Sequence, residues 1–229
     1  MPPRPTNKIN AGSFTHIKLP PKDIIINRSE LNGMRVYYVD DTPLYSVTTI
    51  LGYGHSWVDE WRKEVGDAVA DSISKIASNT GQAIHTLCEH YLYNEDLVIN
   101  NPFLFHRFKK FMSVLNNINN ILCLEKSLYS MKLKMAGTVD CIAEYNGVMS
   151  IIDFKTSKIA KEESDIEDYF LQTTAYAIMI YELYNIKITQ IVILMSVDME
   201  DPVVYIKNIK DYIPKLRARI DTFYNALEK

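Results

Sequence analysis

The stretch Gly137-Thr-Val-Asp140 is followed, after twelve residues, by Asp153-Phe-Lys155, and these two motifs decide the expected fold. They read as two strands, over residues 136–143 and 148–155, joined by the Asn-Gly turn signal of Glu144-Tyr-Asn-Gly147. The second strand runs through apolar residues directly into charged ones, as a buried strand does when it ends in a functional site. We therefore expect a β-hairpin whose strands hold the residues of a functional site.

The geometry of this hairpin favours a divalent metal beside a phosphodiester. Paired strands lie roughly 5 Å apart, so the carboxylates of Asp140 and Asp153 can reach one ion. Alternation turns Asp153 and Lys155 to one face and Phe154 to the other. Carboxylate oxygens suit Mg²⁺ or Mn²⁺, and Lys155 can position or deprotonate the attacking water or stabilise charge on the phosphate. The alternative is that both aspartates only end their strands and face solvent.

A histidine upstream is the next candidate. His85 follows Thr80-Gly81, where we expect one helix from Trp57 to end and a second to begin. A histidine flanked by Ile84 and Leu87 can bind a metal or can be an ordinary core residue.

A polar pair lies downstream. Gln172 and Tyr176 are four residues apart and share one face of a helix expected over about 166–184. They can hydrogen-bond phosphate, a base or the lysine, or Tyr176 can pack as an ordinary aromatic residue.

The remaining sequence organises around these motifs. Residues 1–45 read as a tail with edge strands at 23–27 and 34–39, and Ser46 is a candidate helix N-cap. Residues 46–229 form the expected main domain, with a helical region over about 57–120 and a core over about 121–229. The expected elements of that core and its approach are a helix at 103–117, strands at 121–130, 136–145, 148–155, 190–197 and 203–207, and a closing helix at 210–227.

Composition excludes several classes of protein. A hydrophobic content of 47% supplies a packed core, and no apolar run approaches the roughly 20 residues of a membrane span. We expect no membrane partner and, without a secretory signal, a cytoplasmic location. The net charge of −3 does not suit a protein that coats duplex DNA. Residues 107–161 nevertheless carry nine Lys/Arg against four Asp/Glu, which is either a basic groove or a solvated face.

The order of four motifs resembles a known nuclease family. Gly-x-x-x-His, Gly-Thr-Val-Asp, Asp-x-Lys-Thr and Gln-x-x-x-Tyr occur here in the order typical of the RecB-like branch of the PD-(D/E)XK nuclease superfamily. Within it, the chain resembles the mitochondrial genome maintenance exonucleases and their phage relatives, including their Ser-Val-Thr opening at Ser46. The likeness covers roughly residues 45–200.

This resemblance implies a fold and a metal site. The implied fold is an α/β restriction-endonuclease-like core, with a mixed central β-sheet flanked by helices and an N-terminal helical region. The implied metal ligands are His85, Asp140, Asp153 and the backbone carbonyl of Phe154, and Lys155 is the implied catalytic lysine.

It also implies supporting residues. Glu125 stands where relatives often carry an acidic residue, as an outer contact or an occasional ligand. The residues expected to contact DNA are Gln172, Tyr176, Ser46, Thr48 and Lys158.

The chain departs from the family pattern in a few places. The first motif has Val139 before its aspartate in place of proline, and Asp153 replaces glutamate. Cys88, Cys123 and Cys141 do not supply the four cysteines of an iron–sulfur cluster, so we expect no cluster. No Gly-x-x-x-x-Gly-Lys-Ser/Thr phosphate loop is present, so we expect no dependence on ATP.

The expected function is a Mg²⁺- or Mn²⁺-dependent DNA exonuclease. It would act on single-stranded DNA or single-stranded ends in replication, recombination or repair, with a phage source and a DNA-annealing or replication protein as partner. The helices with Trp57 and Trp61 could arch over the site, or these residues could pack in the core. Open alternatives are a structure-specific endonuclease, a ring-forming duplex exonuclease and a non-hydrolytic DNA-binding accessory protein.

Overall fold

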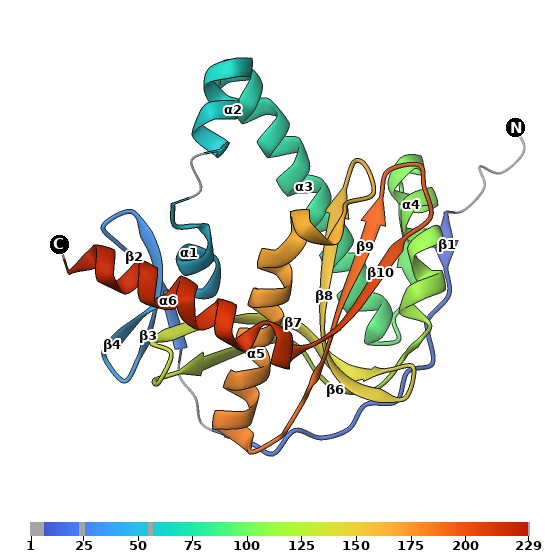
Figure 1. The fold of residues 1–229 in the computed structure, drawn as a ribbon. Coiled ribbons are helices and arrows are strands. Elements are labelled where there is room, and N and C mark those ends of the chain that lie inside the picture. Colours follow the sequence, from blue (N-terminus) through green and yellow to red (C-terminus); the bar gives the residue numbers. More distant parts are fainter. Residues whose placement is uncertain (1–6, 23–25, 55–56, 229) are drawn as a thin grey trace, which may run out of the picture.

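A mixed β-sheet with helices on both faces organises the chain (Figure 1). The structure is a computed structural model that describes residues 7–22, 26–54 and 57–228. The strands are β1 (Lys8–Ile9), β2 (Ile26–Leu31), β3 (Met34–Val39), β4 (Thr42–Ser46), β5 (Leu97–Val98), β6 (Ile118–Ser130), β7 (Met135–Tyr145), β8 (Val148–Ser157), β9 (Gln190–Val197) and β10 (Val203–Asn208).

The main sheet has the strand order β10-β9-β8-β7-β4-β3-β2, and β6 also pairs with β7. The β8–β9 and β4–β7 pairs are parallel, and the remaining pairs of this sheet are antiparallel. A parallel pair needs a long crossover, and the helix between β8 and β9 provides it. The expected mixed sheet flanked by helices is therefore confirmed.

The described residues form six α-helices, most of which pack on the two faces of the sheet (Figure 1). They are α1 (Val47–Gly52), α2 (Trp57–Val65), α3 (Asp67–Leu92), α4 (Pro102–Leu115), α5 (Glu167–Tyr184) and α6 (Ile213–Leu227). Side chains of α1, α5 and α6 share one hydrophobic core, and those of α3 and α4 share the other. Neighbouring residues of β8 alternate between them, because Ile151 faces the first core and Ile152 the second.

The β7–β8 hairpin forms as the sequence predicts. Its turn is Asn146-Gly147, and both residues have positive φ, 51° and 78°. A two-residue type I′ turn requires this conformation at both positions. The backbone pairing runs from Tyr145–Val148 to Cys141–Ile152.

The expected helix break at Thr80-Gly81 is wrong. α3 runs without interruption from Asp67 to Leu92, and the chain breaks instead at Gly66, where φ is +84°. A single glycine inside a helix costs only about 1 kcal/mol, which tertiary packing readily outweighs. A left-handed φ, in contrast, ends a helix outright.

Other boundaries differ by a few residues. The last helix begins at Ile213 because a 3₁₀ turn, Ile209–Asp211, precedes it. Of the strand expected at 23–27, residues 23–25 lie outside the described part, and β2 begins at Ile26. None of the helices in the described ranges has both the length and the apolar content needed to cross a membrane.

Two glycine substitutions test the placement of the helix break. A Cβ on Gly66 would meet no atom within 4 Å, so only its positive φ opposes alanine. We expect Gly66→Ala to lower the free energy of unfolding by about 1 kcal/mol. At Gly81 the new Cβ would lie 3.6 Å from Thr156 Oγ1, an ordinary contact, and Gly81→Ala should raise that free energy by about 0.5–1 kcal/mol. Urea unfolding followed by circular dichroism measures both, and a destabilised Gly81→Ala variant would contradict a continuous α3.

Candidate metal and catalytic site

The site lies where β7 and β8 separate. One residue beyond their last backbone pair, Asp140 Oδ2 accepts a hydrogen bond of 2.8 Å from the backbone N–H of Phe154. The carboxylate thus takes the place that a backbone carbonyl would hold in a continued ladder. Buried N–H groups need such a partner, so Asp140 is fixed in position by the sheet itself.

Three side chains from three elements converge beside this bond. His85 of α3, Glu125 of β6 and Asp140 of β7 each offer one donor atom, and these atoms lie within 4.8 Å of one another. His85 Nδ1 is 3.6 Å from Asp140 Oδ2. One imidazole nitrogen and two carboxylates form a donor set that Mn²⁺ or Mg²⁺ can use. The sequence predicted two of these three residues as ligands.

Glu125 reaches the cluster through an irregular backbone. It adopts a left-handed conformation with φ of +46°, which is uncommon for a residue with a side chain. Its strand pairs with β7 through a register shift between Asn119 and Cys123. The sequence predicted an outer contact or occasional ligand, and the structure places a Glu125 oxygen within 4.8 Å of the donor atoms of His85 and Asp140.

Asp153 lies beside the cluster and pairs with the lysine. Its side chain is 1% exposed, and its Oδ2 is 2.6 Å from Lys155 Nζ. Burial raises the pKa of Asp153 to about 6, although the charge of Lys155 opposes this rise. Its Oδ1 has no hydrogen-bond partner in the described ranges. A buried oxygen without a partner is a place for a donor or a cation, so the residues present fit a divalent metal.

The site concentrates negative charge. Partial burial, together with the carboxylates of Asp140, Glu89 and Asp153, raises the pKa of Glu125 to about 7. These four acidic side chains come from α3, β6, β7 and β8. Such repulsion disfavours the ionised forms together, and a divalent cation would relieve it.

Lys155 is held in its ammonium form. Burial alone would lower the pKa of Lys155, but attraction to Asp153 and Asp140 outweighs burial, and the pKa is raised. Its Nζ also donates to Gln172 Oε1 at 3.5 Å and lies 4.9 Å from the centroid of the Tyr169 ring. A protonated lysine suits stabilisation of charge on a phosphate better than removal of a proton from water.

The position of Tyr176 is the reason that the first motif has a glycine at Gly137. The Tyr176 side chain is 3% exposed, and a Cβ on Gly137 would lie 2.8 Å from its hydroxyl oxygen. Gly137 is therefore needed for close approach of α5 to β7. Gln172 hydrogen-bonds the Tyr176 hydroxyl, whose pKa is raised by burial. The predicted pair on α5 thus faces both the lysine and the first motif.

Ser46, Thr48 and Lys158 are the other residues predicted to contact DNA. Ser46 is confirmed as the N-cap of α1, because its Oγ accepts from the Thr49 N–H at 2.9 Å, and its hydroxyl lies 3.1 Å from Thr48 Oγ1. The parallel pairing of Ser46 with Ala136 brings it next to the first motif. Lys158 is exposed just after β8. Their contacts with DNA stay predictions.

α2 and the first half of α3 project away from the sheet (Figure 1). Trp61 on α2 is half-buried, and the side chain of Trp57 lies outside the described part. Residues 57–76 carry five Asp/Glu and three Lys/Arg, and Arg62 pairs with Asp67 and Asp71. This arm is net acidic, so any contact it makes with DNA would rest on bases more than on phosphates.

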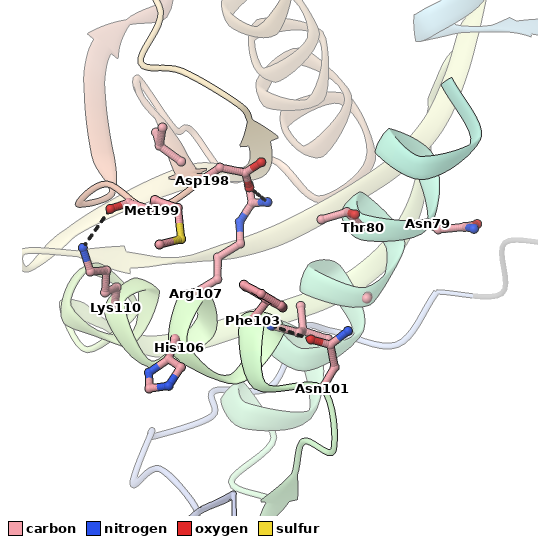
Figure 2. A pocket seen from close by; sticks show the side chains of 12 residues that line it. Asn79, Thr80, Asn101, Phe103, His106, Arg107, Lys110, Asp198 and Met199 are labelled. Atoms are coloured by element: carbon pink, nitrogen blue, oxygen red, sulfur yellow. Dashed lines mark hydrogen bonds and ion pairs between the residues drawn. The ribbon is translucent and has the colours of Figure 1, made fainter. Parts of the chain in front are cut away.

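A separate pocket of about 880 Å³ lies between α3, α4 and the end of β9 (Figure 2). Thr80 and Ala83 of α3 line it, and His85, two residues after Ala83, points to the opposite side of that helix. Arg107 in its wall pairs with Asp198 and hydrogen-bonds the Ser157 carbonyl. The pocket is therefore distinct from the metal cluster.

Two comparisons with known proteins find exonucleases, and no family model matches the sequence. A stretch of 64 residues is 38% identical to mitochondrial genome maintenance exonuclease 1 of Mus musculus, over 28% of this chain and 19% of the mouse protein. A crystal structure from Eubacterium rectale, described as a candidate exonuclease, superposes with a TM-score of 0.41 at 11% identity, over 66% of this chain and 65% of that one. The chain thus spans about a fifth of the mouse protein and just under two thirds of the bacterial one.

A small substitution tests the contact between Gly137 and Tyr176. We expect Gly137→Ala to lower the free energy of unfolding by about 1–3 kcal/mol, because the buried Tyr176 ring has little room to move. Tyr176→Phe removes the atom nearest the new Cβ. The double variant should therefore lose less than the sum of the two single losses in chemical denaturation. Strict additivity would show that the two residues do not meet.

The clustered acids predict how stability depends on pH. The pKa of Glu125 rises from an ordinary 4.5 to about 7 on folding, so the folded state holds more protons between these values. The free energy of unfolding of the metal-free protein should therefore fall as pH rises through this range. Glu125→Gln should make that fall shallower and should be more stable than the wild type at pH 8. Urea titrations in EDTA at pH 5 and pH 8 measure it, and equal slopes for both proteins would contradict it.

Proposed function

We propose that the protein is a metal-dependent DNA exonuclease of the RecB-like PD-(D/E)XK type, with a restriction-endonuclease-like core. The observation that carries this proposal is the convergence of His85, Glu125 and Asp140 beside the buried pair of Asp153 and Lys155. Support also comes from the similar stretch of the mouse protein, which is named as a genome maintenance exonuclease. We also propose the domain arrangement expected from the sequence, in which a helical region precedes a catalytic core over about 121–229.

The proposed roles follow from the positions of the side chains. His85, Asp140 and Glu125 would hold the ion, together with Asp153 and the Phe154 carbonyl. When bound, Mg²⁺ or Mn²⁺ supplies charge stabilisation at a phosphate oxygen and a water of lowered pKa. Lys155, as an ammonium group, donates to a non-bridging oxygen of the same phosphate.

In the proposed reaction, water attacks phosphorus and the bond from phosphorus to the 3′ oxygen breaks. The products are a 5′-phosphate and a 3′-hydroxyl group. Gln172 holds Lys155 in place, and the Tyr176 hydroxyl packs against Gly137. These contacts keep the catalytic side chains in one geometry, which is where most of the gain from positioning arises.

A single-stranded substrate or a single-stranded end fits the charge distribution. The net charge of −3 and the acidic arm do not favour a broad grip on duplex phosphates. Base stacking on aromatic residues is compatible with low positive charge. We place the activity in replication, recombination or repair in a host cytoplasm, with a phage source and a DNA-annealing or replication protein as partner.

The test is digestion of linear and circular single-stranded DNA side by side, in Mg²⁺, Mn²⁺ or EDTA. The proposal expects metal-dependent loss of the linear strand only, and labels at the 5′ and 3′ ends then give the direction. Cutting of the circle would show an endonuclease with the same site. No cutting with any metal would favour a non-hydrolytic DNA-binding protein.

Two substitutions test the assigned residues within that assay. Asp153→Asn and Lys155→Ala should each lower the cleavage rate by roughly 10²- to 10³-fold or more, because the first weakens the hold on the ion and the second removes the ammonium group that acts on the reacting phosphate. DNA binding, measured by fluorescence anisotropy, should change little. Lys132→Ala is the matched control, since Lys132 is exposed in the β6–β7 connection. Wild-type cleavage by either site variant would refute the assignment.

A further inference from the structure

One face of α5 carries a residue that the four motifs do not include. Tyr169, Gln172 and Tyr176 stand three and four residues apart, a spacing that places their side chains on one side of a helix. Gln172 and Tyr176 contact the lysine and the first motif. Tyr169 is one turn earlier on the same face and is half-buried.

The Tyr169 ring contacts the ammonium group of Lys155. The Nζ atom lies 4.9 Å from the ring centroid, within the distance at which a cation is attracted by an aromatic face. The other two contacts of this ammonium differ in strength. Asp153 Oδ2 is close, at 2.6 Å, whereas Gln172 Oε1 at 3.5 Å is at the limit of a hydrogen bond. The ring is therefore a substantial part of what holds the group.

A lysine needs such a constraint more than most residues. Its ammonium is a point charge at the end of a flexible four-carbon stem. An ion pair alone lets that charge rotate around the carboxylate, because attraction depends mainly on distance. An aromatic face on a rigid helix fixes direction as well. Catalysis by positioning is sensitive to displacements of about 1 Å.

We propose that Tyr169 is a positioning residue that holds the Lys155 ammonium group through the face of its ring. This inference rests on the proposed function, since it assigns a role to the lysine of that site. The aromatic ring of Tyr169 makes this contact, and its hydroxyl group is not needed for it. Phenylalanine at this position should therefore preserve it, whereas leucine, an aliphatic side chain without a π-face, should not.

Kinetics on linear single-stranded DNA test the role in catalysis. Tyr169→Leu should lower kcat roughly tenfold or more with little change in KM, the effect expected for a partly desolvated cation–π contact. Tyr169→Phe should stay within about twofold of the wild type. Tyr181→Leu is the control on the same helix, where Tyr181 is 51% exposed. Equal losses in the leucine and phenylalanine variants would overturn the ring as the cause.

A spectroscopic measurement tests the contact without any activity. The ring face should shift the ε-methylene protons of Lys155 upfield in a spectrum of protein with ¹³C-labelled lysine, assigned with Lys155→Ala. The shift should persist in Tyr169→Phe and vanish in Tyr169→Leu. If the wild type lacks the shift, the proposal fails whatever the enzyme does. If the shift is present but the leucine variant keeps its kcat, positioning by Tyr169 is refuted and the exonuclease stands. A wild type that shows the shift but cuts no DNA refutes the function, and with it a catalytic purpose for the contact.

Discussion

The hydrogen bond from the Phe154 N–H to Asp140 Oδ2, 2.8 Å long, joins β7 and β8 at the point where their backbone pairing stops. Two strands that separate inside a sheet leave N–H groups without partners, and each costs free energy unless a side chain satisfies it. The Asp140 carboxylate accepts the hydrogen bond from the Phe154 N–H, and this bond fixes its position. Side chains of α3 and α5, which pack in the two different cores, both come close to β7 near this point. His85, Lys155 and Tyr176 take their places around a carboxylate whose position the backbone determines.

This arrangement carries an electrostatic cost. Asp153 is almost fully buried, and Glu125 and Glu89 add negative charge to that of Asp140. Lys155 offsets part of the cost through one short ion pair, and the pKa of Asp153 is still raised to about 6. Buried charges are normally retained only when they are paired or bind metals. The excess of carboxylates over cations in the described site is therefore the physical reason to expect a divalent ion there. Because carboxylates are in excess, the position of Lys155 determines how much of their negative charge is compensated.

The sequence predicted the parts of this site that depend on local rules. The Asn-Gly turn, the strand pair of β7 and β8, and the shared face of Gln172 and Tyr176 all follow from turn chemistry and periodicity. Two placements depend on tertiary structure: the resemblance implied Glu125 only as an outer contact or an occasional ligand, and Tyr169 was not predicted. Glu125 reaches the cluster through a left-handed backbone in an irregular strand, for which its sequence carries no signal. Tyr169 could have been found, since it lies three residues before Gln172, but its partner is on another element. The break at Gly66 was missed because a glycine in a helix and a glycine that ends one look alike in sequence.

Charge also limits how a nucleic acid could approach. α3 separates the metal cluster from the pocket of Figure 2, and on the pocket side Arg107 and Lys110 are already paired with Asp198 and Asp201. On the other side, the projecting arm of α2 and α3 is net acidic. The described acids of these two surfaces offset much of the positive charge that would attract a duplex along its length. Within the site itself, Lys155 and the divalent ion that the cluster would hold are the positive charges that would face the reacting phosphate. Under the proposed function, a free, unpaired end is the part of DNA that could reach this site with the least distortion.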